Sequence, residues 1–252
     1  MKKRSFWRVG LLALAVGFSA ADGFCAAKAA AGDSDIEVIK KLERLAGLGR
    51  KIVAENQELI NDPAKEDKGF TAAMFSEKLT KYLLDEKIDY AAEVKKGGKS
   101  GKLMKQMMTA MGEVITEAQP LINTPGMGFK GFLPALFARK SFEAFNQKGS
   151  NIRGKLTAKI YRNAKNAPDA WEIKALDQFL GKDYPKGKAI SETLKNDSGE
   201  KVLRYIKPEY YVGACLKCHG DPKGERDITG GLKEGFKEGD AGAALSFTAL
   251  VE

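Results

Sequence analysis

Residues 57–75 read QELINDPAKEDKGFTAAMF, and residues 119–137 read QPLINTPGMGFKGFLPALF. The two stretches align without a gap at an offset of 62 residues and share Gln, Leu-Ile-Asn, Pro, Lys-Gly-Phe, Ala and Phe in one register. This agreement indicates two copies of one unit. Each copy is expected to contain a helix, a turn with Pro and Gly, and a second helix that opens at Lys-Gly-Phe.

The residues before each copy also have helical spacing. Leu42, Leu45, Leu48 and Ile52 recur every three or four positions, and their counterparts are Met104, Met107, Ala110 and Val114. Residues 35–148 are therefore expected to be mainly helical. The stretch KKGGKSG at 95–101 predicts a flexible connection between the copies.

The C-terminal part has a different pattern. Residues 155–161 alternate like a strand, and residues 168–179 begin a helix with Pro and acidic residues. A hairpin is expected from 189–194 and 201–206, with 243–250 as a closing strand. This pattern predicts an α+β protein in which a helical region at 31–100 precedes a second domain at 101–252.

Residues 1–30 have the layout of a signal peptide. A basic start at 1–8 precedes an apolar run at 9–18, and small residues offer Ala-Xaa-Ala cleavage sites. The apolar run is too short for a spanning helix, which needs roughly 20 residues. We expect export to the periplasm, with no membrane span after cleavage. Asp22-Gly-Phe before Cys25 argues against a lipoprotein.

Composition narrows the classes of function. The 252 residues include 42 Lys+Arg, 33 Asp+Glu, three Cys and one His. Removing residues 1–30 takes away five basic residues and one acidic residue, so the net charge falls from +9 to +5. The remaining charges of both signs are interspersed, which argues against a nucleic-acid partner. Three cysteines are too few for a disulfide framework.

The chemistry-bearing motif is Cys215-Leu-Lys-Cys218-His219, the pattern of covalent haem c attachment. Two thiols at this spacing reach two vinyl groups of a porphyrin, and the adjacent imidazole becomes the proximal iron ligand. Three alternatives stay open: a disulfide exchanger, a structural zinc site and a structural cysteine pair. An exchanger would normally place the motif at a helix start in a βαβ context, whereas here it follows an expected strand and the Pro-Glu-Tyr-Tyr loop at 208–211. A zinc site needs four ligands. We therefore expect one covalently bound haem c.

The sixth iron ligand is not fixed by the sequence. A second His is absent, and a Met thioether would give an electron-transfer site of raised potential. The candidates are Met74, Met104, Met107, Met108, Met111 and Met127. Most of the cluster at 104–111 occupies positions that are apolar in the first copy and suits core packing. Met111 is preferred because its counterpart is Gly49. Water, a Lys or an empty position stay open.

Three blocks in the C-terminal part support a family resemblance. They are Arg162-Asn163 with the following Asn166 and Pro168, the segment from Tyr205 through the motif to Gly224, and Glu234-Gly-Phe-Lys-Glu-Gly-Asp240. From about residue 101 onward the chain resembles exported c-type haem proteins with a PAS-like fold. These occur as stand-alone cytochromes and as bacterial sensor domains. The resemblance implies a PAS-like antiparallel sheet with flanking helices beside haem c.

In some relatives a Cys on the helix before the sheet is the distal ligand. The matching position lies near Ile115, where this chain has no Cys. Met111 lies one helical turn earlier and would face the same side. The helical copy before residue 100 lies outside the family core.

The preferred function is a periplasmic monohaem cytochrome that transfers electrons to a redox partner protein. The alternative is a haem-based redox or gas sensor that binds a small diatomic ligand and signals through a separate partner. An enzyme is the weakest hypothesis, because no second titratable constellation accompanies the motif. Helices before PAS-like domains often pair between chains, so analogy also suggests a homodimer. Fold by itself does not settle these roles.

Overall fold

The computed structural model describes residues 34–181 and 183–251, and the expected signal peptide lies outside these residues. The helices are α1 (Asp35–Glu55), α2 (Gln57–Asn61), α3 (Ala72–Asp85), α4 (Tyr90–Lys96), α5 (Lys99–Ile122), α6 (Pro134–Gln147), α7 (Ala170–Phe179) and α8 (Gly213–His219). A 3₁₀ turn, η1 (Ala164–Asn166), precedes α7. The strands are β1 (Ile152–Thr157), β2 (Ile190–Lys195), β3 (Lys201–Tyr210) and β4 (Ala241–Leu250).

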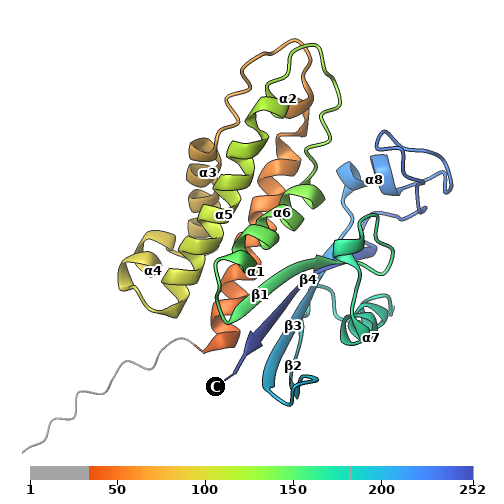
Figure 1. Ribbon diagram of the computed structural model, residues 1–252. Coiled ribbons are helices and arrows are strands. Elements are labelled where there is room, and N and C mark those ends of the chain that lie inside the picture. The colour runs from red at the N-terminus through yellow and green to blue at the C-terminus, as the bar shows by residue number, and fades with distance from the viewer. Residues whose placement is uncertain (1–33, 182, 252) are drawn as a thin grey trace, which may run out of the picture. The chain divides into compact units, whose positions relative to one another are not determined.

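The repeat predicted from the sequence corresponds to a repeated structural unit. Helices α1, α2 and α3 form the first copy, and α5 and α6 form the second (Figure 1). The second helix of each copy begins after Lys-Gly-Phe rather than at it. Gly69 and Gly131 have φ values of +61° and +68°, a left-handed backbone conformation that residues with a side chain rarely adopt. These three residues therefore end the turn, and the helices start at Ala72 and Pro134.

The two turns are joined by reciprocal hydrogen bonds. The Lys68 N–H donates to Asn123 Oδ1 at 3.1 Å, and the Lys130 N–H donates to Asn61 Oδ1 at 2.9 Å. The two glutamines that open the copies make a matching exchange: Gln57 Nε2 donates to the Phe132 carbonyl at 3.0 Å, and Gln119 Nε2 donates to the Phe70 carbonyl at 2.9 Å. Each copy thus satisfies backbone groups of the other, which explains why the same polar residues occur in both.

The sheet is antiparallel with strand order β1-β4-β3-β2. The expected hairpin and closing strand are confirmed as β2, β3 and β4. The strand expected at 155–161 is misplaced. β1 begins and ends earlier, at Ile152 and Thr157, and the chain then leaves the sheet through the exposed Ile160 and Tyr161. The α+β class is confirmed, with helices flanking an open sheet.

Two hydrophobic clusters pack on the two faces of the sheet. α1 and α6 cover one face, and α5 packs on these two helices. On this face Leu245 and Phe247 of β4 join the cluster of buried helical side chains. α7 covers the other face through Ala175, Leu176 and Phe179, which pack on Ile206 and Ala244. Successive strand residues point to opposite faces, so both sides are filled. The boundary expected at residue 100 does not divide this core, because the buried residues of α1 and of β4 belong to the same cluster. In the part of the chain that the structure describes, no helix has the length and apolarity to cross a membrane.

Candidate functional site

The motif cysteines and histidine lie on α8, the short helix between β3 and β4 (Figure 1). β3 continues through Tyr210, and the chain enters α8 after Val212. Most of the expected Pro-Glu-Tyr-Tyr loop is strand instead, because β3 includes residues 208–210, and the motif itself lies in a helix. Helix position no longer speaks against a disulfide exchanger. α8 contains no buried residue, so contacts outside the helix must hold it in place.

His219 is held by a carboxylate from the segment after α8. Its Nδ1 lies 2.7 Å from Glu234 Oε2. Burial raises the pKa of Glu234, but hydrogen bonds from Arg162 and His219 outweigh this effect and leave the pKa lowered. An ionised carboxylate can only accept, so Nδ1 carries the proton and Nε2 is the free imidazole nitrogen. The segment is also tied to the end of α8, because the Phe236 N–H donates to the His219 carbonyl at 2.9 Å.

An aromatic stack supports the imidazole from one side. The Tyr211 ring lies 5.1 Å from the His219 ring and 4.6 Å from the Phe236 ring, measured between centroids. Burial raises the pKa of the Tyr211 hydroxyl, so this side chain stays neutral. The Tyr211 ring, which packs on Phe236, and the Glu234 carboxylate together fix the orientation of the imidazole.

Arg162 connects the loop between β1 and α7 with the segment around the motif. Its guanidinium donates to the carbonyls of Cys218 at 2.8 Å and Leu232 at 3.1 Å. It also binds Glu234 with two nitrogens, at 3.0 and 3.1 Å, and forms an ion pair with Asp227. One side chain therefore holds the end of α8, the following loop and the carboxylate on His219.

Asp227 completes this polar cluster. Its side chain is fully buried, and it accepts from the Thr229 hydroxyl and backbone N–H at 2.6 and 2.7 Å. Burial raises the pKa of Asp227, but the bonds from Thr229 and Arg162 dominate and bring it to about 2. The carboxylate is thus ionised and its charge is compensated.

Cys215 and Cys218 are free thiols that are neither buried nor fully exposed. Burial, and secondarily Asp227, raises the pKa of Cys218. Within residues 34–181 and 183–251, no group of three His, Cys, Asp or Glu side chains is arranged to hold a bare metal ion. The geometry therefore gives no support to the zinc alternative.

Met111 lies in the helical core. It is 1% exposed, and a β-carbon on Gly49 would lie 3.2 Å from its Sδ and 3.3 Å from the rings of Phe75 and Phe137. Met111 thus fills the space that its repeat counterpart, Gly49, leaves open. This position favours core packing over iron coordination for Met111. Met104, Met107 and Met108 are buried in the same cluster.

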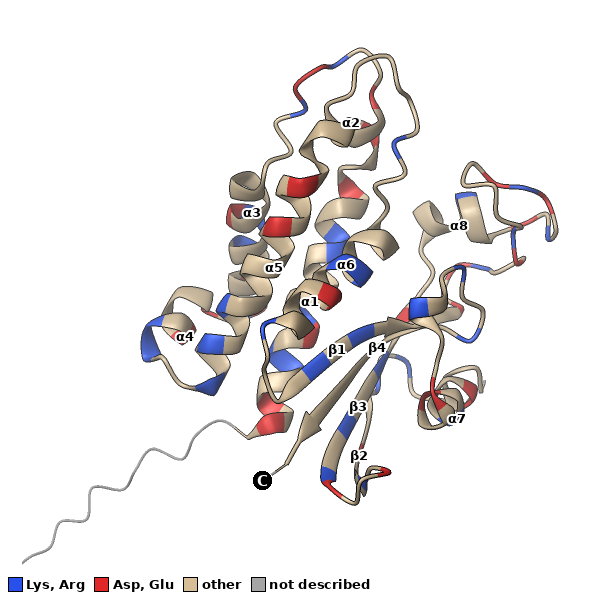
Figure 2. Cartoon of the chain, in the orientation of Figure 1, with Lys and Arg blue, Asp and Glu red and all other residues tan. Residues whose placement is uncertain are grey.

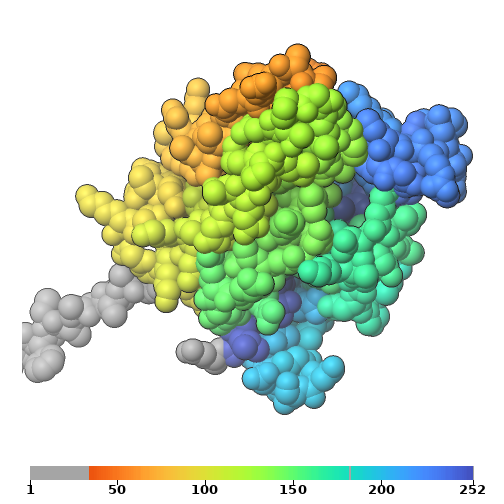
Figure 3. Space-filling model, turned by 45° about the horizontal axis from the view of Figure 1, so that its top comes forward, coloured from red at the N-terminus to blue at the C-terminus, as the bar shows by residue number. Residues whose placement is uncertain are grey.

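Several apolar side chains are exposed in the segments around the motif. Apolar side chains in the segments that flank α8 or lead into Arg162 are about half exposed: Ile160, Tyr161, Val212, Ile228 and Leu232. In Figure 3 the surface is hollowed between the light-green α5–α6 segment and the blue segment that contains α8.

Basic and acidic residues are interspersed over helices, strands and loops in Figure 2, as the sequence predicts.

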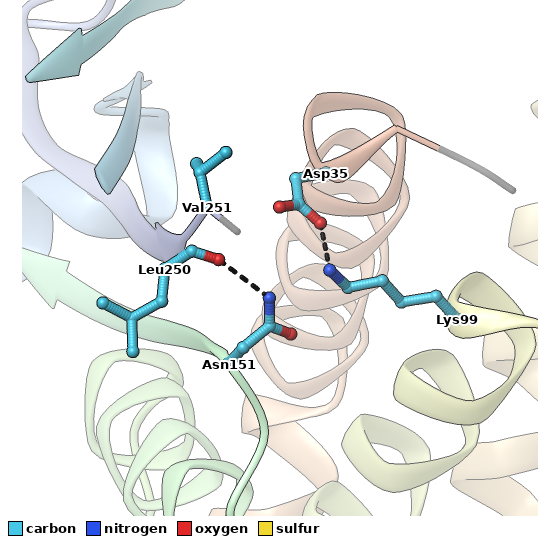
Figure 4. Close-up of a pocket in the computed structure, with 5 residues that line it drawn as sticks. All are labelled: Asp35, Lys99, Asn151, Leu250 and Val251. Atoms are coloured by element: carbon cyan, nitrogen blue, oxygen red, sulfur yellow. Dashed lines mark hydrogen bonds and ion pairs between the residues drawn. The ribbon is translucent and has the colours of Figure 1, made fainter. Parts of the chain in front are cut away.

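A second hollow lies at the other end of β4 (Figure 4). It is lined by Asp35, Lys99, Asn151, Leu250 and Val251. Lys99 pairs with Asp35, and Asn151 Nδ2 donates to the Leu250 carbonyl at 3.0 Å. Its polar groups thus satisfy one another, and none of the motif residues reaches it.

Fold and site together define an α+β protein with a histidine presented beside two free thiols on a short helix, a cytochrome-like arrangement. A model of the Tll0287-like family matches residues 89–249, more than half of the chain. The chain belongs to this family, which is related to haem-binding, cytochrome-like proteins. No curated protein and no solved structure matches it. Residues 34–88 precede the match, although α1 is part of the shared core.

The residues present fit a covalently held haem. Both thiols are free, Nδ1 of His219 is engaged by Glu234, and Nε2 is left for iron. Arg162, Tyr211 and Glu234 are supporting residues to which the sequence analysis assigned no role. Arg162 and Glu234 lie within blocks that carry the family resemblance, but 72 positions separate them, and no local pattern pairs them.

Proposed function

We propose that this protein is an exported, periplasmic c-type cytochrome that carries one haem c on Cys215 and Cys218, with His219 as the proximal iron ligand. The observation that carries the proposal is the state of His219. Its Nδ1 is fixed by Glu234 at 2.7 Å, and its Nε2 is unengaged next to two free thiols. The family membership supports haem binding in general. A PAS-like arrangement of the sheet is part of the proposal.

Residues around α8 would position the haem and line the space next to it. The bound haem would supply one-electron chemistry at iron. Arg162 and the ring stack hold the end of α8, and the half-exposed apolar side chains around it would border the porphyrin. Such partial exposure suits electron transfer, because a redox partner can approach an uncovered haem edge. We propose a carrier and not an enzyme.

A haem-based sensor is the second candidate. One observation favours it: α1 is tied to β3 close to the motif. Lys207 of β3 donates to the buried Glu43 of α1 at 2.9 and 3.1 Å, and Arg50 of α1 pairs with Glu209. A change at α8 could therefore reach the helices through the end of β3. A sensor of this kind would signal through a separate partner protein.

The test uses protein expressed with its own leader in a host that matures c-type cytochromes. We expect haem to stay with the polypeptide through acid–acetone extraction and a denaturing gel. Haem recovered in the organic phase would refute covalent attachment. The two roles differ in their response to carbon monoxide. Slow or absent binding to the reduced form indicates a carrier with both axial positions filled, and rapid binding indicates a sensor.

A further inference from the structure

The contact of His219 with Glu234 lies on the side of the imidazole opposite the nitrogen that would meet iron. We propose that Glu234, held in place by Arg162, is a positioning residue that sets the electron-donating strength of His219 and thereby lowers the midpoint potential of the haem iron. The inference rests on the proposed haem attachment and adds a control of potential to it.

The geometry makes this contact stronger than an ordinary backbone hydrogen bond. The Glu234 side chain is 12% exposed, and its Oε2 accepts both from His219 Nδ1 at 2.7 Å and from Arg162 Nη2 at 3.1 Å. Arg162 Nε donates to the other oxygen at 3.0 Å. The carboxylate is therefore ionised, oriented by two bonds and sheltered from most solvent competition.

The chemical consequence follows from the proton on Nδ1. A carboxylate that accepts this proton draws it away from the ring, which gives the imidazole more anionic character. A more anionic imidazole donates more electron density through Nε2 and stabilises ferric over ferrous iron. Hydrogen bonding beyond the axial ligand is a recognised means by which a protein adjusts haem potential. In contrast, a neutral acceptor would leave the imidazole a weaker donor and the potential higher.

The same loop offers a matched control. Glu225 carries the same charge, is 53% exposed and pairs with Lys233 at 2.8 Å. The substitutions Glu234→Gln and Glu225→Gln remove the same charge from the same loop, but only the first changes the acceptor of the imidazole proton. A general electrostatic effect would move the potential in both variants. A specific effect through His219 would move it mainly in Glu234→Gln.

The experiment is a redox titration of the purified holoprotein and its variants, followed in the haem absorption bands. We expect an upward shift of the midpoint potential in Glu234→Gln that clearly exceeds the shift in Glu225→Gln. Glu234→Asp, which keeps the charge on a shorter side chain, should restore part of the wild-type value. It also provides the comparison with wild type if Glu234→Gln does not fold.

Equal potentials in wild type and Glu234→Gln, both with covalent haem, would overturn this inference and leave the proposed cytochrome intact. Equal upward shifts in the two glutamine variants would also overturn it, because bulk charge would then be the cause. A wild-type protein without covalent haem would instead refute the proposed function.

Discussion

The helical bundle and the segment around α8 are stabilised in different ways. In the bundle, Phe75 and Phe137 are fully buried, and their rings meet edge to face at 5.3 Å. α8 has no buried residue and is held by Arg162, by His219–Glu234 and by a ring stack. The bundle is thus stabilised by an apolar core. The motif segment is held by a polar clamp that consists of Arg162, Asp227 and Glu234. This difference is consistent with the haem site proposed above.

The largest effect on stability is expected in the bundle. Phe137→Ala should lower the free energy of unfolding by about 3–5 kcal/mol, because it opens a cavity between α1, α3 and α6. The control is Leu84→Ala: Leu84 is 60% exposed and should change stability by about 0.5 kcal/mol or less. Chemical denaturation followed by circular dichroism measures both. Similar losses in the two variants would contradict the contrast between core and surface.

In the clamp, Arg162→Gln should act locally. It removes the donor to Glu234, Asp227 and two backbone carbonyls. Hydrogen bonds to charged groups contribute about 1.5–3 kcal/mol each, so amide exchange in 218–234 should accelerate by about tenfold or more. The control Arg226→Gln loses a single bond to the Gly230 carbonyl. Unchanged exchange rates in Arg162→Gln, measured by mass spectrometry, would show that the clamp lies elsewhere.

The two repeat turns should respond alike to loss of their asparagines. Asn61→Ala and Asn123→Ala each leave a backbone N–H of the other copy without its acceptor, at Lys130 and Lys68. Each substitution should cost about 1–2 kcal/mol in the free energy of unfolding. Thermal denaturation of the two variants tests this symmetry. A loss confined to one variant would mean that the two exchanges are not equivalent in energy.

The smallest effect concerns acid. The pKa of Asp227 is about 2 in the folded protein and ordinarily 3.8. Because the pKa is lowered, the ionised side chain stabilises the fold at pH values above the ordinary pKa of 3.8. This contribution is lost as the pH falls through about 2. Carboxyl-carbon NMR should give a midpoint near 2 for Asp227 in the wild type. A midpoint near 4 would show that the clamp does not act on this carboxylate.

The features that could be predicted from the sequence are those that depend on residues close together in the chain. Helical spacing, the paired Leu-Ile-Asn stretches and the hairpin around 196–199 all reappear, because periodicity and turn chemistry act over short distances. The choice of Met111 rested on its contrast with Gly49, and the structure gives this contrast a packing explanation. Its counterpart, Gly49, packs directly against it, so the missing side chain in one copy is compensated by the large one in the other.

The supporting residues of the site could not be predicted in this way. His219 could be singled out as a candidate iron ligand because it directly follows the two cysteines in the sequence. Arg162 and Glu234 meet only after β4 has paired with β1 and with β3, and this pairing depends on contacts across the whole domain. The start of α8 was missed because Lys207–Tyr210 continue β3 despite the proline at 208.

The central claim is that Cys215 and Cys218 hold one haem covalently. Intact-mass spectrometry of the denatured protein, purified after export, tests it most directly. The wild type should carry the added mass of a single haem, and the Cys215→Ala, Cys218→Ala double variant should carry none. A wild-type mass equal to that of the bare polypeptide, from a host that matures other c-type cytochromes, would contradict the account.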